Sequence, residues 1–166
     1  MASEPPAYEV KFNEWVAKIG GLHPAFVHVP VTDVPWAPLR RPLNECRVAL
    51  VTTGGVHRQD QRPFDQWNEE GDWTSREIPD ETPSDQLRIS HVHYAHEDAE
   101  RDINCVFPID RVHELQRQGV IGSVSPVHFG FMGYIPDPRG LVASTAPAVA
   151  QRLKDHGVDA VLMSSG

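Results

Sequence analysis

The chain has no long hydrophobic run and no excess of positive charge, and each absence removes a class of function. No apolar stretch approaches the roughly 20 residues that a membrane-spanning helix needs. Lys and Arg number 15 against 23 Asp and Glu, a formal net charge of −8 with no basic stripe. We therefore expect no nucleic-acid partner and no membrane association. The first residues, MASEPPAYEV, hold neither a positively charged segment nor an apolar core, so we expect no secretory signal and a cytoplasmic location.

Cysteine is also scarce, with only Cys46 and Cys105 in the chain. In a cytoplasmic protein two cysteines far apart in the sequence are expected to be reduced. Both are expected to be packed, unreactive thiols, Cys46 at the start of a strand and Cys105 between apolar neighbours. The glycine-rich segments TTGG and GFMGY match no phosphate-binding fingerprint, and no Ser–His–Asp set follows a nucleophile elbow.

Proline is frequent, and its distribution indicates how the chain is organised. Five of the 15 prolines fall within residues 24–42, which predicts an extended ordered loop. A short amphipathic helix is expected before it, with Val10, Trp15 and Ile19 at helical spacing and Gly20 as its end. We predict an N-terminal helix and proline-rich arm over residues 1–46 and an α/β domain over residues 47–166.

Residues 47–166 alternate between strand and helix patterns. The apolar run 48–51 predicts a strand buried on both faces, and residues 87–94 alternate as a half-buried strand does. Helices are expected after Pro108, ending at Gly119, and after Thr145 as a cap, ending at Gly157. A short strand follows each helix, so we predict an α/β fold with a mostly parallel sheet of βαβ units.

The last strand, within VDAVLMSS, is apolar on both faces and is followed only by Gly166. A parallel strand of this kind is expected in the centre of a sheet with helices on both sides. We therefore interpret the chain as truncated after a central-type strand; the alternative is an edge strand at which the chain ends. Ligands of open α/β sheets bind at the carboxyl ends of strands, where Ser164 and Ser165 lie.

Five segments together resemble the selenoprotein B family, the B subunits of glycine, sarcosine, betaine and D-proline reductases. The segments are VALVTTGGVH, GDWTSREIP, DINCVFPIDR, GVIGSVSPVHFGFMGYI and GVDAVLMSSG. They run in order from about Arg47 to Gly166. GDWTSREIP and the GVIG and FMGYI segments are more similar to the proline reductase branch than to the glycine reductase branch.

The resemblance implies a subunit of a dithiol-dependent reductase that cleaves a carbon–nitrogen bond of an amino acid or related amine. In this family a selenocysteine or cysteine nucleophile follows the strand that matches VDAVLMSSG, so we expect it just after Gly166. Selenocysteine is encoded by UGA, which is ordinarily read as a stop, and the chain alone would then be inactive. No cofactor is implied within the chain. Selenium is expected downstream, a pyruvoyl group on a partner subunit, and a dithiol as electron donor.

Several polar residues are candidates for supporting such a site. His57 and His128 each come at or near the end of a strand, where a proton donor or carboxylate anchor could act. His91 and His93 lie two apart on a predicted strand and share a face, which favours substrate or anion binding. The other candidate substrate-binding residues are Asp72, Arg76, Ser164 and Ser165.

Each candidate has a simpler interpretation, and two other functions stay open. The histidines could be hydrogen-bonded framework residues, and Asp72 with Arg76 an ordinary surface pair. A non-catalytic α/β protein that binds a small molecule is one alternative function. The other is a metal-dependent enzyme that uses His91 and His93 with Asp98 or Asp102, although the spacing matches no established zinc signature and we predict no metal site.

Overall fold

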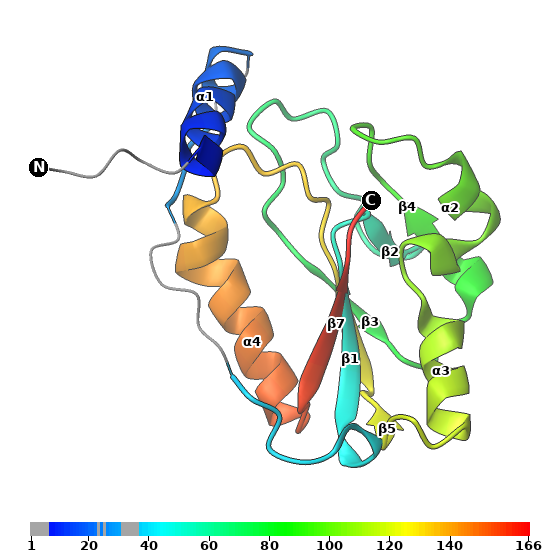
Figure 1. The fold of residues 1–166 in the computed structure, drawn as a ribbon. Coiled ribbons are helices and arrows are strands. Elements are labelled where there is room, and N and C mark those ends of the chain that lie inside the picture. Colours follow the sequence, from blue (N-terminus) through cyan, green and yellow to red (C-terminus); the bar gives the residue numbers. More distant parts are fainter. Residues whose placement is uncertain (1–6, 23, 25, 31–36) are drawn as a thin grey trace, which may run out of the picture.

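The computed structural model describes residues 7–22, 24, 26–30 and 37–166. Its main feature is a five-stranded sheet with a helix packed on each face (Figure 1). The strands are β1 (Arg47–Thr52), β3 (Arg76–Pro79), β5 (Ser123–Val124), β6 (Val127–Gly130) and β7 (Ala160–Ser164). The predicted α/β fold with a mostly parallel sheet is therefore confirmed.

Strand β1 lies in the centre of the sheet because it pairs on both sides. Val48 lies opposite Val124 of β5 and Ala160 of β7, and Thr52 lies opposite Gly130 of β6 and Ser164 of β7. All of these pairings are parallel, whereas β3 runs antiparallel to β6. The carboxyl ends of β1, β6 and β7 therefore meet at one edge of the sheet.

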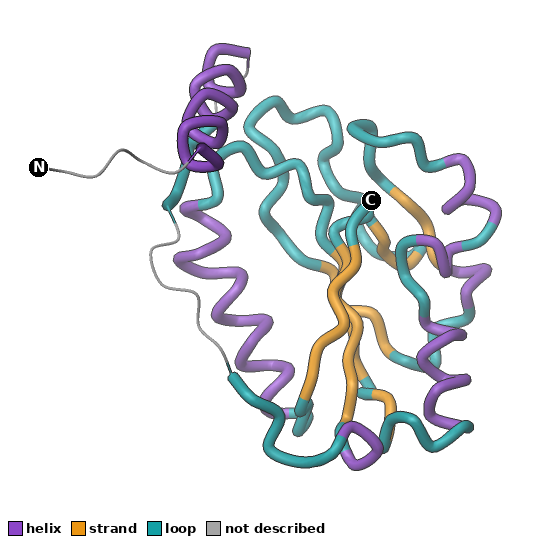
Figure 2. The backbone as a smooth tube through the Cα atoms, viewed as in Figure 1, coloured by secondary structure: helices purple, strands orange, loops and turns teal. Residues whose placement is uncertain are grey.

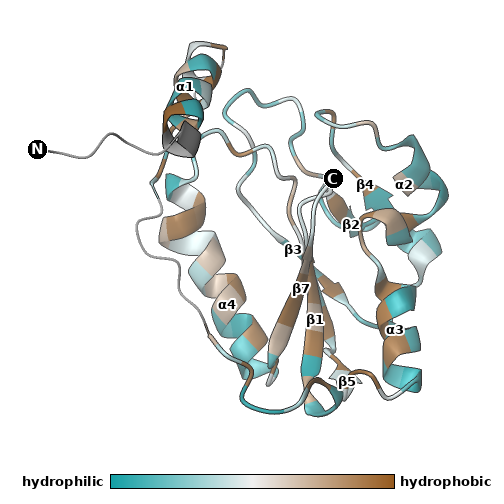
Figure 3. Cartoon of the chain, in the orientation of Figure 1, coloured by the Kyte–Doolittle hydropathy of each residue, from teal (hydrophilic) through white to brown (hydrophobic). Residues whose placement is uncertain are grey.

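The alternating side chains of β1 build two separate hydrophobic cores. Val48 and Leu50 pack on the side of α3 (Ile109–Arg117), together with Ile109 and Val112 of that helix. Ala49 and Val51 face α4 (Ala146–Asp155) and pack with its apolar residues Val149 and Leu153. This two-sided burial explains why the run 48–51 has no polar residue. Figure 3 shows hydrophobic colours on β1 and β7 and in bands along α3 and α4.

Smaller elements surround the sheet, and long loops gather where its strands end (Figure 2). A second, two-stranded antiparallel sheet pairs β2 (Val56–Arg58) with β4 (Leu87–Ile89). The other helices are α1 (Ala7–Leu22) and α2 (Glu97–Arg101), with 3-10 turns η1 (Leu43–Glu45), η2 (Ser84–Gln86) and η3 (Ile103–Cys105). One π-helical turn, η4 (Leu141–Thr145), leads directly into α4.

Strand β7 lies at an edge of the sheet that the described residues form, and the interpretation of the chain as truncated after a central-type strand stays a prediction. Among these residues β7 pairs only with β1. Its side chains are correspondingly exposed, with relative accessibilities of 41% for Val161, 43% for Leu162 and 70% for Met163. The apolar character of β7 is thus present, but the described part of the chain does not cover it.

Four local predictions fail and two hold. Helix α1 continues through Gly20 to Leu22. Thr145 makes no capping bond because η4 already continues the helix upstream. Strand β4 ends at Ile89, before the histidines, and Cys105 is exposed in η3. The glycine stops hold, since Gly119 and Gly157 take the positive φ of helix C-termini, 71° and 66°.

The structure describes only part of the proline-rich segment and does not test the predicted division of the chain. The proline-rich segment has no helix or strand where it is described before η1, and residues 31–36 lie outside the described residues. The division into an arm over residues 1–46 and a domain over residues 47–166 stays a prediction. No helix in the described part of the chain is long and apolar enough to span a bilayer.

Candidate functional site

The loops that follow β1, β6 and β7 are held together by backbone hydrogen bonds. The N–H of Thr53, just after β1, donates to the carbonyl of Ser164 at 3.0 Å. The N–H of Gly55 donates to the carbonyl of Phe131, in the loop after β6, at 2.8 Å. The three strand ends therefore form one connected surface, beside which the C-terminus lies in Figure 1.

A cavity of about 200 Å³ opens on this surface, and we call it the strand-end cavity. Its lining comes from all three strand ends and from the segment after β4. The lining residues are Thr53, His91, His93, Gly133, Tyr134 and Gly166. None of these six described residues is a lysine, arginine, aspartate or glutamate, so their side chains carry no fixed charge.

His91 and His93 come together as predicted, although a turn and not a strand brings them there. The N–H of His93 donates to Nδ1 of His91 at 3.0 Å, and the two rings meet edge to face at 5.7 Å. His91 is buried, with a relative accessibility of 7%. Burial, with smaller contributions from the charges of His93 and His96, lowers the pKa of His91 to about 4. His91 is therefore neutral near pH 7.

Two tyrosines that sequence reasoning missed complete this cluster. Tyr134 stacks on His93 with ring centres 3.8 Å apart and planes 18° from parallel. Tyr94 packs edge to face on His91 at 4.7 Å, and its hydroxyl donates to the carbonyl of Gly54 at 2.9 Å. Burial, and secondarily the charge of Glu100, raises the pKa of Tyr94, so its hydroxyl stays protonated. Their positions in the segment after β4 and in the loop after β6 were the available signal.

Two glycines allow the loops to approach this closely. Gly55 and Gly133 both have positive φ, 76° and 84°. A Cβ on Gly55 would lie 2.5 Å from the carbonyl oxygen of Ser90, and one on Gly133 would lie 2.7 Å from that of Thr53. Both distances are shorter than van der Waals contact, so any other residue would push these loops apart.

His57 lies in β2 and is not among the residues that line the strand-end cavity. Its Nδ1 lies 2.8 Å from the carbonyl of Arg58, so that nitrogen carries the proton. Nε2 therefore accepts from the Ser90 hydroxyl, also at 2.8 Å. Burial is the largest cause that lowers the pKa of His57. The geometry supports a neutral histidine that joins β2 to β4.

His128 lies inside β6, not after a strand end, and is fully buried. The N–H of Leu50 donates to its Nδ1 at 2.9 Å. Nε2 therefore carries the proton and donates to Asp80 at 3.0 Å, and Nε2 of His113 lies 3.0 Å from the same carboxylate oxygen. Both ring nitrogens of His128 are hydrogen-bonded within the core, as expected for a residue that stabilises the fold. This geometry does not support the predicted role of His128 as a proton donor.

Asp72 and Arg76 do form a pair, with Nη2 3.8 Å from Oδ2. Burial opposes the charge of Asp72, but hydrogen bonds from Thr74 and the Asp65 N–H, with the charge of Arg76, hold its pKa below the usual value. Arg76 also donates to the carbonyls of Arg62, Pro63 and Ser75. Asp72 and Arg76 both line a separate cavity of about 570 Å³. Their hydrogen bonds mainly hold the loop before β3 in place.

The two serines at the end of β7 differ. The hydroxyl of Ser164 donates to the carbonyl of Val106 at 2.6 Å and so links β7 to the segment after η3. Because this hydroxyl already has a partner, the geometry does not favour Ser164 as a ligand-binding residue. Ser165 is exposed beside Gly166. Cys105 is exposed as well, contrary to the predicted buried thiol, and its Sγ lies 3.8 Å from the carbonyl of Asp98.

A metal site finds no support in the described residues. Within them, no group of three His, Cys, Asp or Glu side chains is placed to hold an ion. Nδ1 of His91 is already an acceptor, Asp98 pairs with Arg101 at 2.8 Å, and Asp102 accepts from Asn104. Among the described residues, His91, His93, Asp98 and Asp102 therefore do not form a set of metal ligands.

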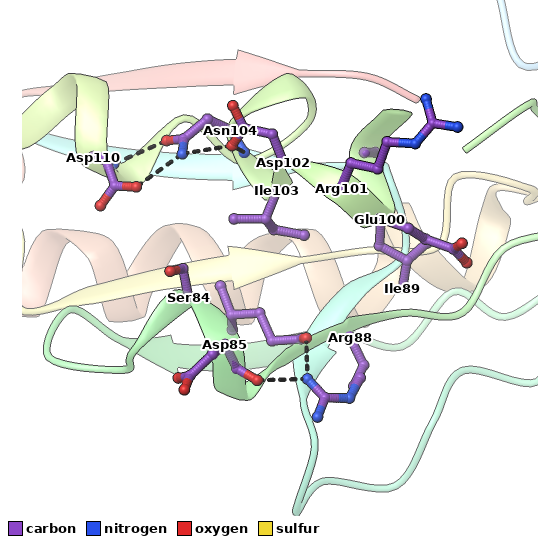
Figure 4. A pocket seen from close by; sticks show the side chains of 12 residues that line it. Ser84, Asp85, Arg88, Ile89, Glu100, Arg101, Asp102, Ile103, Asn104 and Asp110 are labelled. Carbon is purple, nitrogen blue, oxygen red and sulfur yellow. Dashed lines mark hydrogen bonds between the residues drawn. The ribbon is translucent and has the colours of Figure 1, made fainter. Parts of the chain in front are cut away.

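Another cavity of about 570 Å³ lies between β4, α2 and η3 (Figure 4). One wall carries the side-chain network of Asn104, which donates to Asp102 at 2.9 Å and to Asp110 at 2.8 Å. On the other wall Arg88 donates to the carbonyl of Asp85 at 2.7 Å. Because these polar groups satisfy one another, we assign no ligand to this cavity.

Comparison with known proteins gives a consistent family. The family model for glycine/sarcosine/betaine reductase selenoprotein B matches residues 19–166. D-proline reductase subunit gamma of Acetoanaerobium sticklandii is 39% identical over 141 residues, which cover 84% of this chain and 57% of that protein. Glycine reductase complex component B subunit gamma of Carboxydothermus hydrogenoformans is 29% identical over 160 residues, 90% of this chain and 35% of that protein.

A third relative is sarcosine reductase complex component B subunit beta of Peptoclostridium acidaminophilum, 26% identical over 140 residues. The match covers 82% of this chain and 32% of that protein. The chain thus spans between about a third and three fifths of the length of these relatives. No solved structure matches it. The predicted resemblance is confirmed: the chain belongs to the glycine/sarcosine/betaine reductase selenoprotein B family.

Proposed function

We propose that the chain is part of a dithiol-dependent reductase that cleaves a carbon–nitrogen bond of an amino acid or related amine. The nucleophile is a selenocysteine or cysteine placed immediately after Gly166. The observation that carries this proposal is that Gly166 lines the strand-end cavity beside His91 and His93. A residue following Gly166 would enter the site from the carboxyl end of β7, where ligands of α/β sheets bind.

The chemistry suits this position. The ionised selenol or thiol attacks the substrate carbon, the carbon–nitrogen bond breaks, and the amine leaves with its electron pair and a proton. A thiol then attacks the selenium or sulfur of the adduct, the bond from that atom to carbon breaks, and the carbon takes up a proton with the electron pair. A dithiol reduces the new selenium–sulfur or sulfur–sulfur bond, which regenerates the nucleophile as the dithiol becomes a disulfide. A pyruvoyl group on a partner subunit supplies activation of the amine, and no residue of this chain is assigned to hold it.

The chain's own residues bind and orient the ligand in this proposal. His91 and His93 face the cavity, and Tyr94 and Tyr134 hold their rings in place. Gly55 and Gly133 keep the loops close together around the cavity. D-proline is the first substrate to test, because the relative with 39% identity is named for it.

The test combines the gene with an activity assay. We expect an in-frame UGA or cysteine codon after that of Gly166, followed by sequence of the same family. We also expect the assembled complex to reduce D-proline with dithiothreitol, and to lose that activity when the nucleophile is changed to serine. A UAA or UAG codon at that position, or full activity of the serine variant, would contradict the proposal.

A further inference from the structure

The tautomer of His91 can be derived from its contacts. Nδ1 accepts the backbone N–H of His93 at 3.0 Å, so this nitrogen holds a lone pair and no proton. A neutral imidazole has one N–H, which must then be on Nε2. The neighbouring ring of Tyr94, at 4.7 Å, and the burial of His91 leave little room for the ring to turn.

Nε2 of His91 points to the strand-end cavity. It lies 3.4 Å from the position that a Cβ on Gly133 would occupy, and both residues line the cavity. The described residues provide no hydrogen-bond acceptor for this N–H. This nitrogen is also not among the described buried side-chain atoms that lack a partner, so it is open to the cavity, where the acceptor of a bound ligand can replace water.

The charges around His91 favour the neutral form. On its own segment, His93 and His96 face it and would repel a second positive charge. From α2, Glu100 is engaged with Nδ1 of His96 at 3.0 Å. Tyr94 and Tyr134 are the other titratable residues close to this cluster. None of these groups provides a carboxylate partner that would hold an imidazolium at His91.

We propose that His91 is a neutral, directional hydrogen-bond donor, whose Nε2–H binds the carboxylate of a zwitterionic ligand in the strand-end cavity. The inference rests on the proposed function for the class of ligand. A wall with no fixed charge suits a ligand of zero net charge, since neither its carboxylate nor its ammonium group is repelled. A neutral N–H can still form a charge-assisted bond to the carboxylate, as backbone N–H groups do.

The protonation state is tested first, by nitrogen-15 NMR of the histidine side chains in the purified protein. We expect His91 in the neutral Nε2–H form throughout the range from about pH 5.5 to about pH 7.5. D-proline should shift its Nε2 resonance, whereas pyrrolidine, which lacks the carboxylate, should not. An imidazolium, an Nδ1–H tautomer, or equal shifts with both compounds would overturn the inference.

Binding of D-proline to variants is the second test, measured by calorimetry. His91→Leu should weaken binding by about tenfold, the equivalent of one charge-assisted hydrogen bond. His91→Gln, whose amide N–H can reach the Nε2 position, should stay within about threefold of the wild type. Thermal unfolding of both variants shows that each is folded, and pyrrolidine should bind all three proteins equally.

The pH dependence of D-proline binding and the activity of the assembled complex distinguish failure of this inference from failure of the proposed function. Affinity for D-proline should be constant from about pH 8 to about pH 5.5, whereas an imidazolium anchor would weaken binding above about pH 6.5. Absence of D-proline binding, or no loss in His91→Leu, overturns the inference even when the assembled complex reduces D-proline. Conversely, an inactive complex with the expected His91 behaviour counts against the proposed reaction alone.

Discussion

Backbone conformation at single glycines controls the approach of the loops around the strand-end cavity. Gly133 and Gly119 both have positive φ, so replacement of either by alanine strains the backbone by about 1 kcal/mol. Only Gly133 is also enclosed, because its Cβ would lie 2.7 Å from the Thr53 carbonyl, whereas nothing lies within 4 Å at Gly119. The two positions therefore form a matched pair.

We predict that Gly133→Ala lowers the free energy of unfolding by about 3 kcal/mol and Gly119→Ala by about 1 kcal/mol. The difference measures the close contact with Thr53 and not the φ strain. Urea denaturation of both variants provides the measurement. Equal losses in the two variants would show that the loops relax without cost.

The buried histidines predict how stability depends on pH. The pKa of His91 falls from the ordinary 6.5 to about 4 in the folded chain, so the unfolded chain binds more protons between these values. Its contribution is fully present above about pH 6.5 and is lost as the pH falls toward about 4. His57, whose pKa burial also lowers, acts in the same direction.

Accordingly, the free energy of unfolding should fall by about 2 kcal/mol more in the wild type than in His91→Gln between about pH 7 and about pH 4.5. Denaturant titrations at several pH values give both curves. Parallel curves for the two proteins would mean that His91 titrates normally in the folded state.

At the scale of elements, the side chain of His128 accepts a hydrogen bond from β1 at a point where the backbone pairing of the sheet is interrupted. Pro126 separates β5 from β6, and its carbonyl accepts from the Asp80 N–H and not from β1. The N–H of Leu50 in β1 therefore lacks a backbone partner, and Nδ1 of His128 provides the acceptor. The ring also reaches Asp80 beyond β3 and so joins three elements in the core.

Replacing His128 by leucine should therefore cost about 3 kcal/mol, because it leaves the buried Leu50 N–H and part of Asp80 without partners. His113→Leu removes the other, partly exposed histidine from the same carboxylate and should cost about 1 kcal/mol or less. Urea denaturation compares the two variants, and hydrogen exchange at Leu50 reports the broken ladder directly. A loss for His113→Leu as large as that for His128→Leu would contradict this account.

At the scale of the whole molecule, β7 presents an exposed apolar edge in the described part of the chain. An apolar edge strand with unpaired backbone groups is a template for association. We expect the 166-residue chain to self-associate with rising concentration and Leu162→Lys to reduce this. Val142→Lys replaces a valine that is also exposed, in η4, and should leave association unchanged. Analytical ultracentrifugation measures the difference; a monomeric wild type at all concentrations would exclude it.

The sequence placed two of the candidate residues side by side, and their part in a site stays a prediction. His91 and His93 were correctly grouped, because residues two apart stay close in a turn as well as in a strand. Tyr134 lies 41 positions after His93, and a stacking contact over that separation has no local pattern. The assignment of His128 to a strand end failed for a similar reason. Its partners in β1 and after β3 become neighbours only when the sheet forms.

The sequence by itself determined the family, the α/β class, and the positions of β1, α3 and α4, since local periodicity, glycine stops and apolar runs depend on near neighbours. Only the tertiary structure decided that β7 lies at an edge, that Cys105 is exposed, and that His91 has a single free N–H directed into a cavity. These properties depend on contacts between segments far apart in the chain, where burial and hydrogen-bond pairing are established together.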